Sequence, residues 1–403
     1  MAYTFNNQYS VADTAQIDAF GRTRTSETTS LLALNHVYSL QDDLETTSIV
    51  GAGASVNSDG SSGVLLQVQF GGDHVIRQSR CAAPYQPGKS QIFEASFYGM
   101  TLNSNVIKRV GAFDSDTTGD FSTGLDGFFL ESDGVNHSFN IYSGGNRVVQ
   151  ETANNWLTSD YNYADIDWAQ SQLMMVDYQW LGVGRVRFYM VIDGIPRLFY
   201  EYTHANNFSG VYMLRPNKPI RYEIRVSGIS EGGELGQICS QISTEGSLND
   251  LYKTASILQT DTDVLARNTT WGVVGFRLAA GYSGVKAYIK NFSLVQLSGE
   301  EYLIKIVRNP SLTSPPTWER IVDTPIEYAI PTTNNNVRVA GDEIRSYLAD
   351  SSFSGSGAVE LGDSAYSAGF TIEGVAEEFW LCILPVGRAG ARFAAAMNVE
   401  FYD

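Results

Sequence analysis

Carboxylates are the most numerous titratable side chains in this sequence, and a pair of them could do hydrolytic chemistry. A glycosidase needs two carboxylates facing each other across a cleft, one to donate a proton and one to attack or to activate water. The candidates along the predicted strands are Glu94, Asp126, Glu131, Asp177, Glu201 and Glu223. No Glu-x-Asp-x-x-Glu run places two of them close together on one strand. We therefore expect no catalytic residue among them.

Metal ligands are the next candidates. The four histidines, at positions 36, 74, 137 and 204, share no spacing that is typical of metal ligands. Asp114–Asp120 alternates carboxylates, as calcium loops do, but Thr118 and Leu125 stand where an EF-hand loop needs carboxylates. We interpret this run as a solvated hairpin turn and expect no metal and no other cofactor. We expect His204, which follows an aromatic strand, to be a hydrogen-bonded hairpin residue.

Charge and cysteine content exclude several classes of protein. The 403 residues include 27 Lys and Arg against 44 Asp and Glu, which gives a net charge of −17. A nucleic-acid partner or an anionic membrane would require a surplus of basic side chains, so we expect neither. The spacing of Cys81, Cys239 and Cys382 fits no disulfide framework or zinc site, and we expect three buried thiols in a chain made in a reducing cytoplasm. The sequence has no signal peptide pattern and no run of 18 apolar residues.

Alternating hydrophobic patterns predict β-strands along most of the chain. Hydrophobic residues make up 43% of the sequence and aromatic residues 12%, with 38 glycines scattered among them. Val64–Phe70 alternates apolar and polar residues, and Asp193-Gly194 is typical of a tight hairpin turn. Turn signals recur about every 8 to 15 residues, the spacing of a β-sandwich or jelly roll. We therefore expect an all-β protein.

An aromatic run between Asn154 and Trp168 could contact a partner. We expect its large rings to be exposed on loops; they belong to Trp156, Tyr161, Tyr163 and Trp168. Aromatic rings with carboxamides can stack on sugars and hydrogen-bond to them, and Tyr and Trp are also enriched at subunit interfaces. Both readings are open, and we favour the interface.

Two short motifs stand out from the rest of the chain. Residues 17–26 (IDAFGRTRTS) are polar and lack apolar periodicity, so we expect an extended arm that something else must order. Residues 180–188 (WLGVGRVRF) have the pattern of a strand. In this strand Arg185 and Arg187 take one face, while Val186 and Phe188 take the other.

These motifs resemble the "DAFGR-x-R" arm and the "WLGVGRVRF" strand of a family of virion structural proteins from tailed, cyanophage-like bacteriophages. The resemblance covers most of residues 10–300, and one departure is Thr23, where relatives usually carry an apolar residue. It implies a non-enzymatic, multimeric virion component. It also implies that the arm docks to the particle, through Asp18, Phe20, Gly21, Arg22 and Arg24.

Ion pairs are expected along the second motif. Arg185 and Arg187 could bind a carboxylate or phosphate ligand, but pairing with acidic residues on neighbouring strands is the default in an acidic chain. We expect Asp177 to neutralise one of the two arginines as a partly exposed pair and Trp180 to be structural.

The predicted organisation has three parts. Residues 1–60 form the extended N-terminal arm, residues 61–298 a jelly-roll β-sandwich, and residues 299–403 a smaller C-terminal β-sandwich. Lys290–Val295 resembles the last strand of concanavalin-like jelly rolls, and this likeness sets the boundary near residue 298.

Three functional hypotheses follow. The first is a virion structural protein: a tail fibre, an appendage or a capsid-surface subunit, assembled as a homotrimer with other virion proteins as partners. The second is a carbohydrate-binding adhesin that recognises a host surface glycan. The third is a jelly-roll enzyme that degrades polysaccharides.

Overall fold

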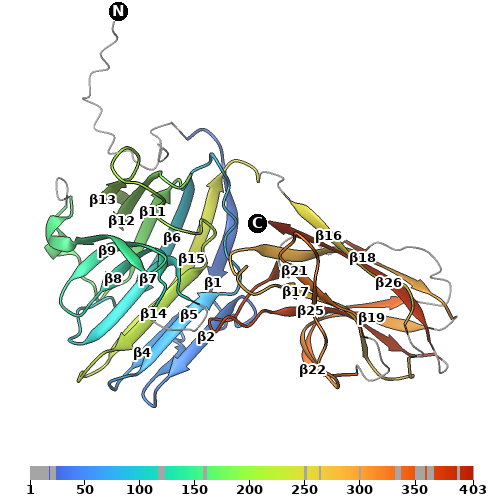
Figure 1. Cartoon of the computed structure of the whole chain (residues 1–403). Helices are drawn as coiled ribbons and strands as arrows, with labels where there is room; N and C mark the ends of the chain where they lie inside the picture. The colour runs from blue at the N-terminus through green and yellow to red at the C-terminus, as the bar shows by residue number, and fades with distance from the viewer. Residues whose placement is uncertain are drawn as a thin grey trace, which may run out of the picture. The chain divides into compact units, whose positions relative to one another are not determined.

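The computed structural model describes residues 18, 24–116, 123–157, 161–248, 252–262, 265–298, 301–331, 337–349, 359–360, 367–387 and 391–402. These residues form antiparallel β-sheets and contain no α-helix. They divide into two compact units, Met1–Asn249 and Asp250–Asp403 (Figure 1). No helix in this part of the chain has the length and apolar character needed to cross a membrane.

The first unit contains an eight-stranded sheet. Its order is β13 (Ile195–Thr203), β12 (Arg185–Ile192), β11 (Gln172–Tyr178), β6 (Gln91–Tyr98), β15 (Gly233–Glu245), β4 (Val64–Val68) and β3 (Ser55–Ser58), and β1 (Thr28–Asn35) also pairs with β15. Each strand is antiparallel to its neighbours.

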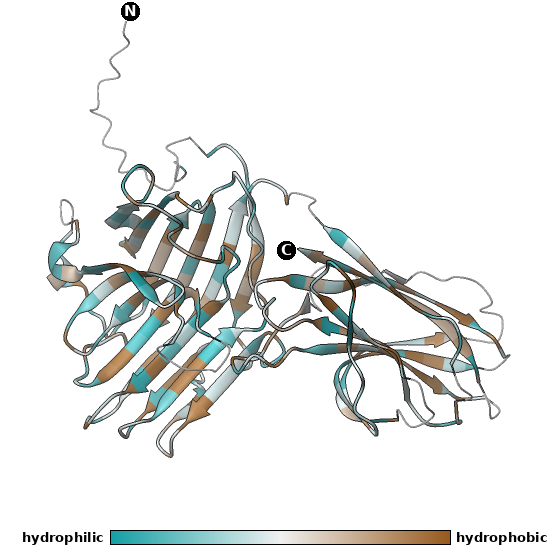
Figure 2. Ribbon diagram, viewed as in Figure 1, coloured by the Kyte–Doolittle hydropathy of each residue, from teal (hydrophilic) through white to brown (hydrophobic). Residues whose placement is uncertain are grey.

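A seven-stranded sheet packs against it. Its order is β10 (Asn146–Thr152), β9 (His137–Ser143), β8 (Asp126–Ser132), β7 (Val106–Asp114), β14 (Ile220–Val226), β5 (His74–Ser79) and β2 (Glu45–Val50). Two single-turn 3-10 helices, η2 (Ala153–Asn155) and η3 (Tyr163–Asp165), lie between β10 and β11. The apolar positions of both sheets meet in one core, as the hydropathy bands of Figure 2 illustrate.

The second unit has the same design on a smaller scale. Its five-stranded sheet contains β16 (Lys253–Gln259), β26 (Phe393–Tyr402), β18 (Lys286–Gln296), β23 (Val359–Glu360) and β24 (Ser367–Ala368). Its six-stranded sheet has the order β20 (Glu319–Arg320), β21 (Ile326–Ala329), β17 (Trp271–Leu278), β25 (Glu378–Pro385), β19 (Tyr302–Leu312) and β22 (Arg338–Ala349). A separate apolar core lies between these sheets.

The predicted all-β class is confirmed, as β-sandwiches, but two predicted boundaries are wrong. β16, β17 and β18, which we assigned to the first sandwich, pair with the C-terminal strands β25 and β26 and belong to the second unit. The arm does not extend to residue 60, because β1, β2 and β3 are integral strands of the first sandwich. β2 and β3 are short and largely polar and pair through their backbones, so their composition did not reveal them. β1 has an apolar centre, Leu31–Leu34, but its partner β15 lies far along the chain, so the sequence did not place it in the sandwich.

Candidate functional site

An ion pair between β11 and β12 is the centre of the candidate site. Asp177 and Arg187 are direct cross-strand partners, and a nitrogen of the Arg187 guanidinium contacts Asp177 Oδ2. The neighbours Val176, Tyr178 and Val186 are core residues, so the alternation of a strand places the pair on the outer face of the sheet. The expected pairing of Asp177 across the sheet is confirmed for Arg187.

The N-terminal motif supplies the second cation. Arg24 Nη2 lies 2.8 Å from Asp177 Oδ1 and donates to Ser90 Oγ at 3.0 Å, while Arg24 Nε donates to Glu245 Oε1 at 2.6 Å. Ser90 Oγ also donates to Asp177 Oδ1 at 2.5 Å. Two guanidiniums and two carboxylates thus form one network, which neutralises its own charge.

Asp18 extends the same contact to the next strands. Its backbone carbonyl accepts a hydrogen bond from Arg185 Nη2 at 3.2 Å, and Arg185 pairs with Glu201 of β13 at 3.3 Å. Asp18 is only 1% exposed and the Asp177 side chain likewise 1%. An outward-facing carboxylate can be buried to this degree only if other groups cover it, and Arg24 is one of these groups. Our expectation of a partly exposed Asp177 pair is therefore wrong.

A tight turn joins β11 to β12 and completes the site. Leu181 has φ 35° and Gly182 φ 77°. A Cβ added at Gly184 would lie 1.6 Å from the carbonyl oxygen of Gln179, so only glycine fits there. Trp180 Nε1 donates to the Met213 carbonyl at 3.1 Å, which fixes the turn to the loop after β13.

The structure therefore joins the two sequence motifs. Asp18 and Arg24 of the first contact Arg185 and, through Asp177, Arg187 of the second. We expected Asp18 and Arg24 to dock on another protein, whereas they contact the chain's own sheet. Phe20, Gly21 and Arg22 lie outside the described residues. We name this network of Asp18, Arg24, Asp177, Arg185 and Arg187 the motif junction.

The aromatic run is not an exposed surface. Trp156 and Trp168 are core residues at 3% and 8% exposure, and Tyr161 and Tyr163 are only partly buried against the same core. His137 stacks on Trp168 with ring centroids 4.1 Å apart, donates from Nε2 to the Met100 carbonyl and accepts from the Tyr163 hydroxyl. These rings close one side of the sandwich core, so our expectation of exposed loop aromatics is wrong for both tryptophans.

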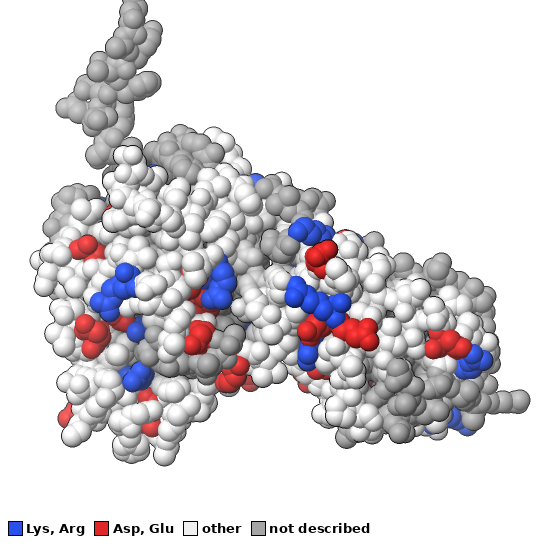
Figure 3. Space-filling view, viewed as in Figure 1, with Lys and Arg blue, Asp and Glu red and all other residues white. Residues whose placement is uncertain are grey.

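The remaining carboxylate candidates are held by cations or amides. Arg109 of β7 bridges Glu131 of β8 and Glu223 of β14, with N–O distances of 2.6 and 2.7 Å. Glu131 and Glu223 are the direct cross-strand partners of Arg109 on the two adjacent strands. Arg221 also contacts Glu223, at 2.7 Å. Charged side chains of opposite sign also lie beside one another on the face in view in Figure 3.

Asp126 and Glu94, two further carboxylate candidates, also have partners. Lys218 contacts both Asp114 and Asp126, and it is itself fully buried. Burial by itself would raise the pKa of Asp126, but the Lys218 ammonium and backbone donors outweigh it, so the pKa is lowered. Glu94 accepts from the side-chain amide of Gln241. A carboxyl with a lowered pKa, such as that of Asp126, does not have the surroundings of a general acid.

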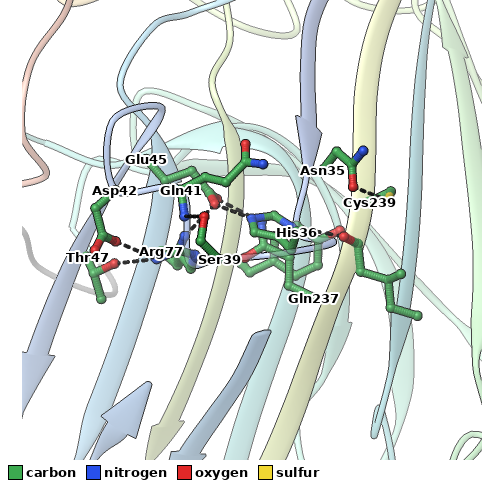
Figure 4. Close-up of polar contacts among 12 residues, drawn as sticks. Asn35, His36, Ser39, Gln41, Asp42, Glu45, Thr47, Arg77, Gln237 and Cys239 are labelled. Carbon is green, nitrogen blue, oxygen red and sulfur yellow. Dashed lines mark hydrogen bonds and ion pairs between the residues drawn. The ribbon is translucent and has the colours of Figure 1, made fainter. Parts of the chain in front are cut away.

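A second buried network escaped the sequence analysis. His36, after β1, donates from Nδ1 to the Ile238 carbonyl at 2.9 Å and lies 2.5 Å from Glu45 Oε2 through Nε2 (Figure 4). Arg77 Nη2 lies 2.7 Å from the same carboxylate, and Gln237 donates to its other oxygen. Burial tends to raise the pKa of Glu45, but the His36 hydrogen bond and the Arg77 charge outweigh it and lower the pKa. This network fixes the segment between β1 and β2 to the sandwich interior.

Other sequence signals have structural roles. His204 Nε2 donates to the Gly210 carbonyl and Nδ1 accepts from the Tyr202 hydroxyl, which confirms the expected hydrogen bonds. The expected hairpin is wrong, because His204 lies between β13 and β14, which belong to different sheets. Cys382 is buried, but Cys81 is partly exposed and Cys239 exposed, so our expectation of three buried thiols is wrong for those two. Among the described residues, no group of three His, Cys, Asp or Glu side chains is arranged to hold a metal ion.

Gly228–Gly232 matches the Gly-x-Ser-x-Gly spacing of a nucleophile elbow. Ser230 lies between β14 and β15, where a strand-to-helix turn is absent, and its hydroxyl accepts a hydrogen bond from the Gly232 N–H. The match therefore lacks the structural context of a hydrolase nucleophile.

Comparisons with known proteins give structural likenesses only. No family model and no curated protein matches the chain. The carbohydrate recognition domain of Emp47p has 12% sequence identity and a TM-score of 0.36, and the match covers 55% of this chain and 98% of that one. The carbohydrate esterase of Shiga toxin-encoding bacteriophage phi24B has 14% identity and a TM-score of 0.35, over 55% and 100%. The VIP36 exoplasmic/lumenal domain has 12% and 0.36, over 56% and 100%. At these scores the likenesses carry no argument about function.

Proposed function

We propose that this chain is a non-enzymatic structural subunit of a bacteriophage virion, which assembles as a homo-oligomer and attaches to the particle through its N-terminal segment. The observation that carries the proposal is the motif junction. The two motifs behind the phage resemblance lie more than 150 residues apart, yet Asp18 contacts Arg185 directly and Arg24 contacts Arg187 through Asp177. Such a junction anchors an arm to a sandwich, which suits a part that must bear load on a particle.

The junction also changes which residues the proposal assigns to docking. Arg24 holds the arm to its own subunit, so residues before Asp18 are the ones available to reach a partner. Deleting residues 1–30 would remove Arg24 and the first residues of β1, and it would damage the sandwich as well as the arm. The informative truncation is therefore a deletion of residues 1–17.

Particle incorporation tests the proposal directly. The full-length chain and the chain lacking residues 1–17 would each be expressed during infection in a host whose phage lacks the gene. We expect the full-length chain in purified particles and the truncated chain only in the soluble fraction, with equal thermal stability. Absence of the full-length chain from particles would overturn the virion role.

The two alternative functions are separated by activity measurements. Binding to a glycan array, retained by the truncated chain, would support the adhesin hypothesis. Release of reducing sugar ends from a polysaccharide would support the enzyme hypothesis. The proposal expects neither, because the carboxylates weighed as catalytic are engaged by Arg109, Lys218 and their neighbours.

A further inference from the structure

An apolar patch on the first unit lies beside the motif junction. It consists of five large side chains on the β11–β12 turn and on the loop after β13: Leu181 (49% exposed), Val183 (39%), Phe208 (61%), Val211 (38%) and Leu214 (60%). We name these five residues the turn patch. Single exposed apolar side chains are ordinary on a protein surface, but several of them on one turn and on the loop held against it indicate a contact site.

Contacts at Gly182 hold the β11–β12 turn against the loop after β13, which carries the other three residues of the turn patch. A Cβ on Gly182 would lie 2.9 Å from Val211 Cγ1, and the Tyr212 N–H donates to the Gly182 carbonyl at 3.1 Å. Leu214 follows three residues later, with its backbone N–H bound to Asp126. Phe208 stacks on Tyr202 with ring centroids 6.0 Å apart. Leu181, whose side chain is apolar, has a positive φ in this turn. Residues other than glycine rarely adopt that backbone conformation.

We propose that the turn patch binds residues 1–17 of a second copy of this chain; this inference rests on the oligomeric virion role proposed above. The first argument is where the described chain ends. From Arg24, held at β11 and Glu245, to Asp18, held at Arg185, the chain crosses towards β13, the last strand of its sheet. Asp18 is therefore held at the first residue of β12, one strand from that edge and two residues along the chain from Val183 of the turn patch.

The second argument is length. Seventeen residues precede Asp18, and an extended chain of that number spans at most about 56–61 Å. Covering the chain's own patch, which is two residues along the turn from Arg185, would need only a small part of this reach. The full length suits a neighbouring subunit.

The third argument is chemical complementarity. Residues 1–17 contain one charged side chain, Asp13, and the apolar or aromatic residues Tyr3, Phe5, Tyr9, Val11 and Ile17. Two copies with a net charge of −17 each repel one another, so an uncharged contact is the one least opposed by that repulsion. The aromatic and apolar side chains of the arm in an apolar patch make such a contact, and repeated around a ring it closes a cyclic oligomer.

The test measures oligomeric mass and peptide binding in solution. The proteins are the full-length chain, the chain lacking residues 1–17, the patch variant Leu181→Asp/Leu214→Asp and the control Ile229→Asp. Ile229 is 97% exposed in the β14–β15 loop, at the opposite end of the strands from the turn patch. Melting curves first establish that each variant folds. A labelled peptide of residues 1–17 is then titrated into each protein.

We expect the full-length chain and Ile229→Asp to have a multiple of the 44.2 kDa mass. The truncated chain and the patch variant should be monomers. The peptide should bind the truncated chain, and the same two patch substitutions in that chain should weaken binding about tenfold or more.

Three results would overturn the inference. One is a truncated chain that remains oligomeric, and another is peptide binding that the patch substitutions leave unchanged. The third is a full-length chain that is a monomer and does not bind the peptide, while the truncated chain does. In that case the arm of each chain occupies the patch of the same chain. These outcomes are independent of particle incorporation: a chain that incorporates without arm exchange loses only this inference, and one that exchanges arms but never enters particles loses only the virion role.

Discussion

At the scale of single residues, the outer face of the eight-stranded sheet shows how a charge can be buried without a ligand. Asp177 faces away from the core, and strand alternation was sufficient to predict that it pairs with Arg185 or Arg187, but only the cross-strand register of the structure selects Arg187. Its burial was not predictable, because the covering group, Arg24, comes from a polar segment with no periodic pattern. Long-range ion pairs of this kind leave no local signal in a sequence.

Replacing Asp177 should be costly for this reason. In Asp177→Asn the Arg24 and Arg187 guanidiniums lose a shared buried anion, and we expect the free energy of unfolding to fall by about 3–5 kcal/mol. Glu201→Gln is the matched control, because Glu201 pairs with Arg185 at 31% side-chain exposure and its removal should cost less than about 1 kcal/mol. Urea denaturation of both variants measures the difference. Equal losses would contradict the buried network.

His137 should make stability depend on pH. Burial, partly offset by its hydrogen bond to the Met100 carbonyl, lowers the pKa of His137 to about 4. The unfolded chain takes up the proton near pH 6.5 and the folded chain does not, so this stability is fully present above pH 6.5 and is lost as pH falls through 4. The loss by pH 4.5 should be about 2–3 kcal/mol. Denaturation at pH 7 and pH 4.5 measures it, and His137→Gln should remove this share of the pH dependence; an unchanged dependence would refute the assignment.

At the scale of elements, the β11–β12 turn and the loop between β10 and β11 show what a sequence pattern cannot predict. The sequence predicted the strand from Arg185 onward and both of its faces correctly, but the expected strand over residues 180–188 is wrong at its start, because residues 181–184 form the turn before β12. It also predicted exposed aromatics between β10 and β11, where Trp156 and Trp168 instead complete the core. The neighbouring Asp and Asn residues indicated a loop, and the structure has a loop there. The aromatic rings of this loop, however, cover one side of the sandwich core. Composition places a loop on the surface and does not say which way its side chains face.

Gly184 and Gly194 are required in their turns for different reasons. Gly184 has no room for a Cβ, whereas Gly194 in the β12–β13 turn has φ 75° and nothing within 4 Å of an added Cβ. We expect Gly184→Ala to lower the free energy of unfolding by about 3 kcal/mol or more, because the Gln179 carbonyl must move. Gly194→Ala should cost only about 1 kcal/mol for its left-handed backbone. Thermal and urea unfolding compare them, and the reverse order would show that the turn tolerates the methyl group.

At the scale of the whole molecule, the division into two units depends on partners far apart in sequence. The apolar alternation of β18 was evident, and its resemblance to a closing jelly-roll strand placed it in the first sandwich. Its hydrogen-bonding partner is β26, whose residues begin about 100 positions later. Periodicity identifies a strand and its buried face, but the choice of sheet is made by long-range pairing. The β class was therefore predictable and the boundary was not.

Fragments can distinguish the two boundaries. A fragment of residues 1–249 contains both sheets of the first sandwich and should fold cooperatively and remain soluble. A fragment of residues 1–298 adds β16, β17 and β18 without their partners β25 and β26, so buried side chains such as Ile289 and Phe292 become exposed. We expect this longer fragment to bind a hydrophobic dye and to aggregate, although it contains more of the native chain. Soluble yield, dye fluorescence and melting curves measure the difference. If fragment 1–298 is as soluble as fragment 1–249 and does not bind the dye, β16–β18 can complete a sheet of the first sandwich. The boundary near residue 298 would then be the correct one.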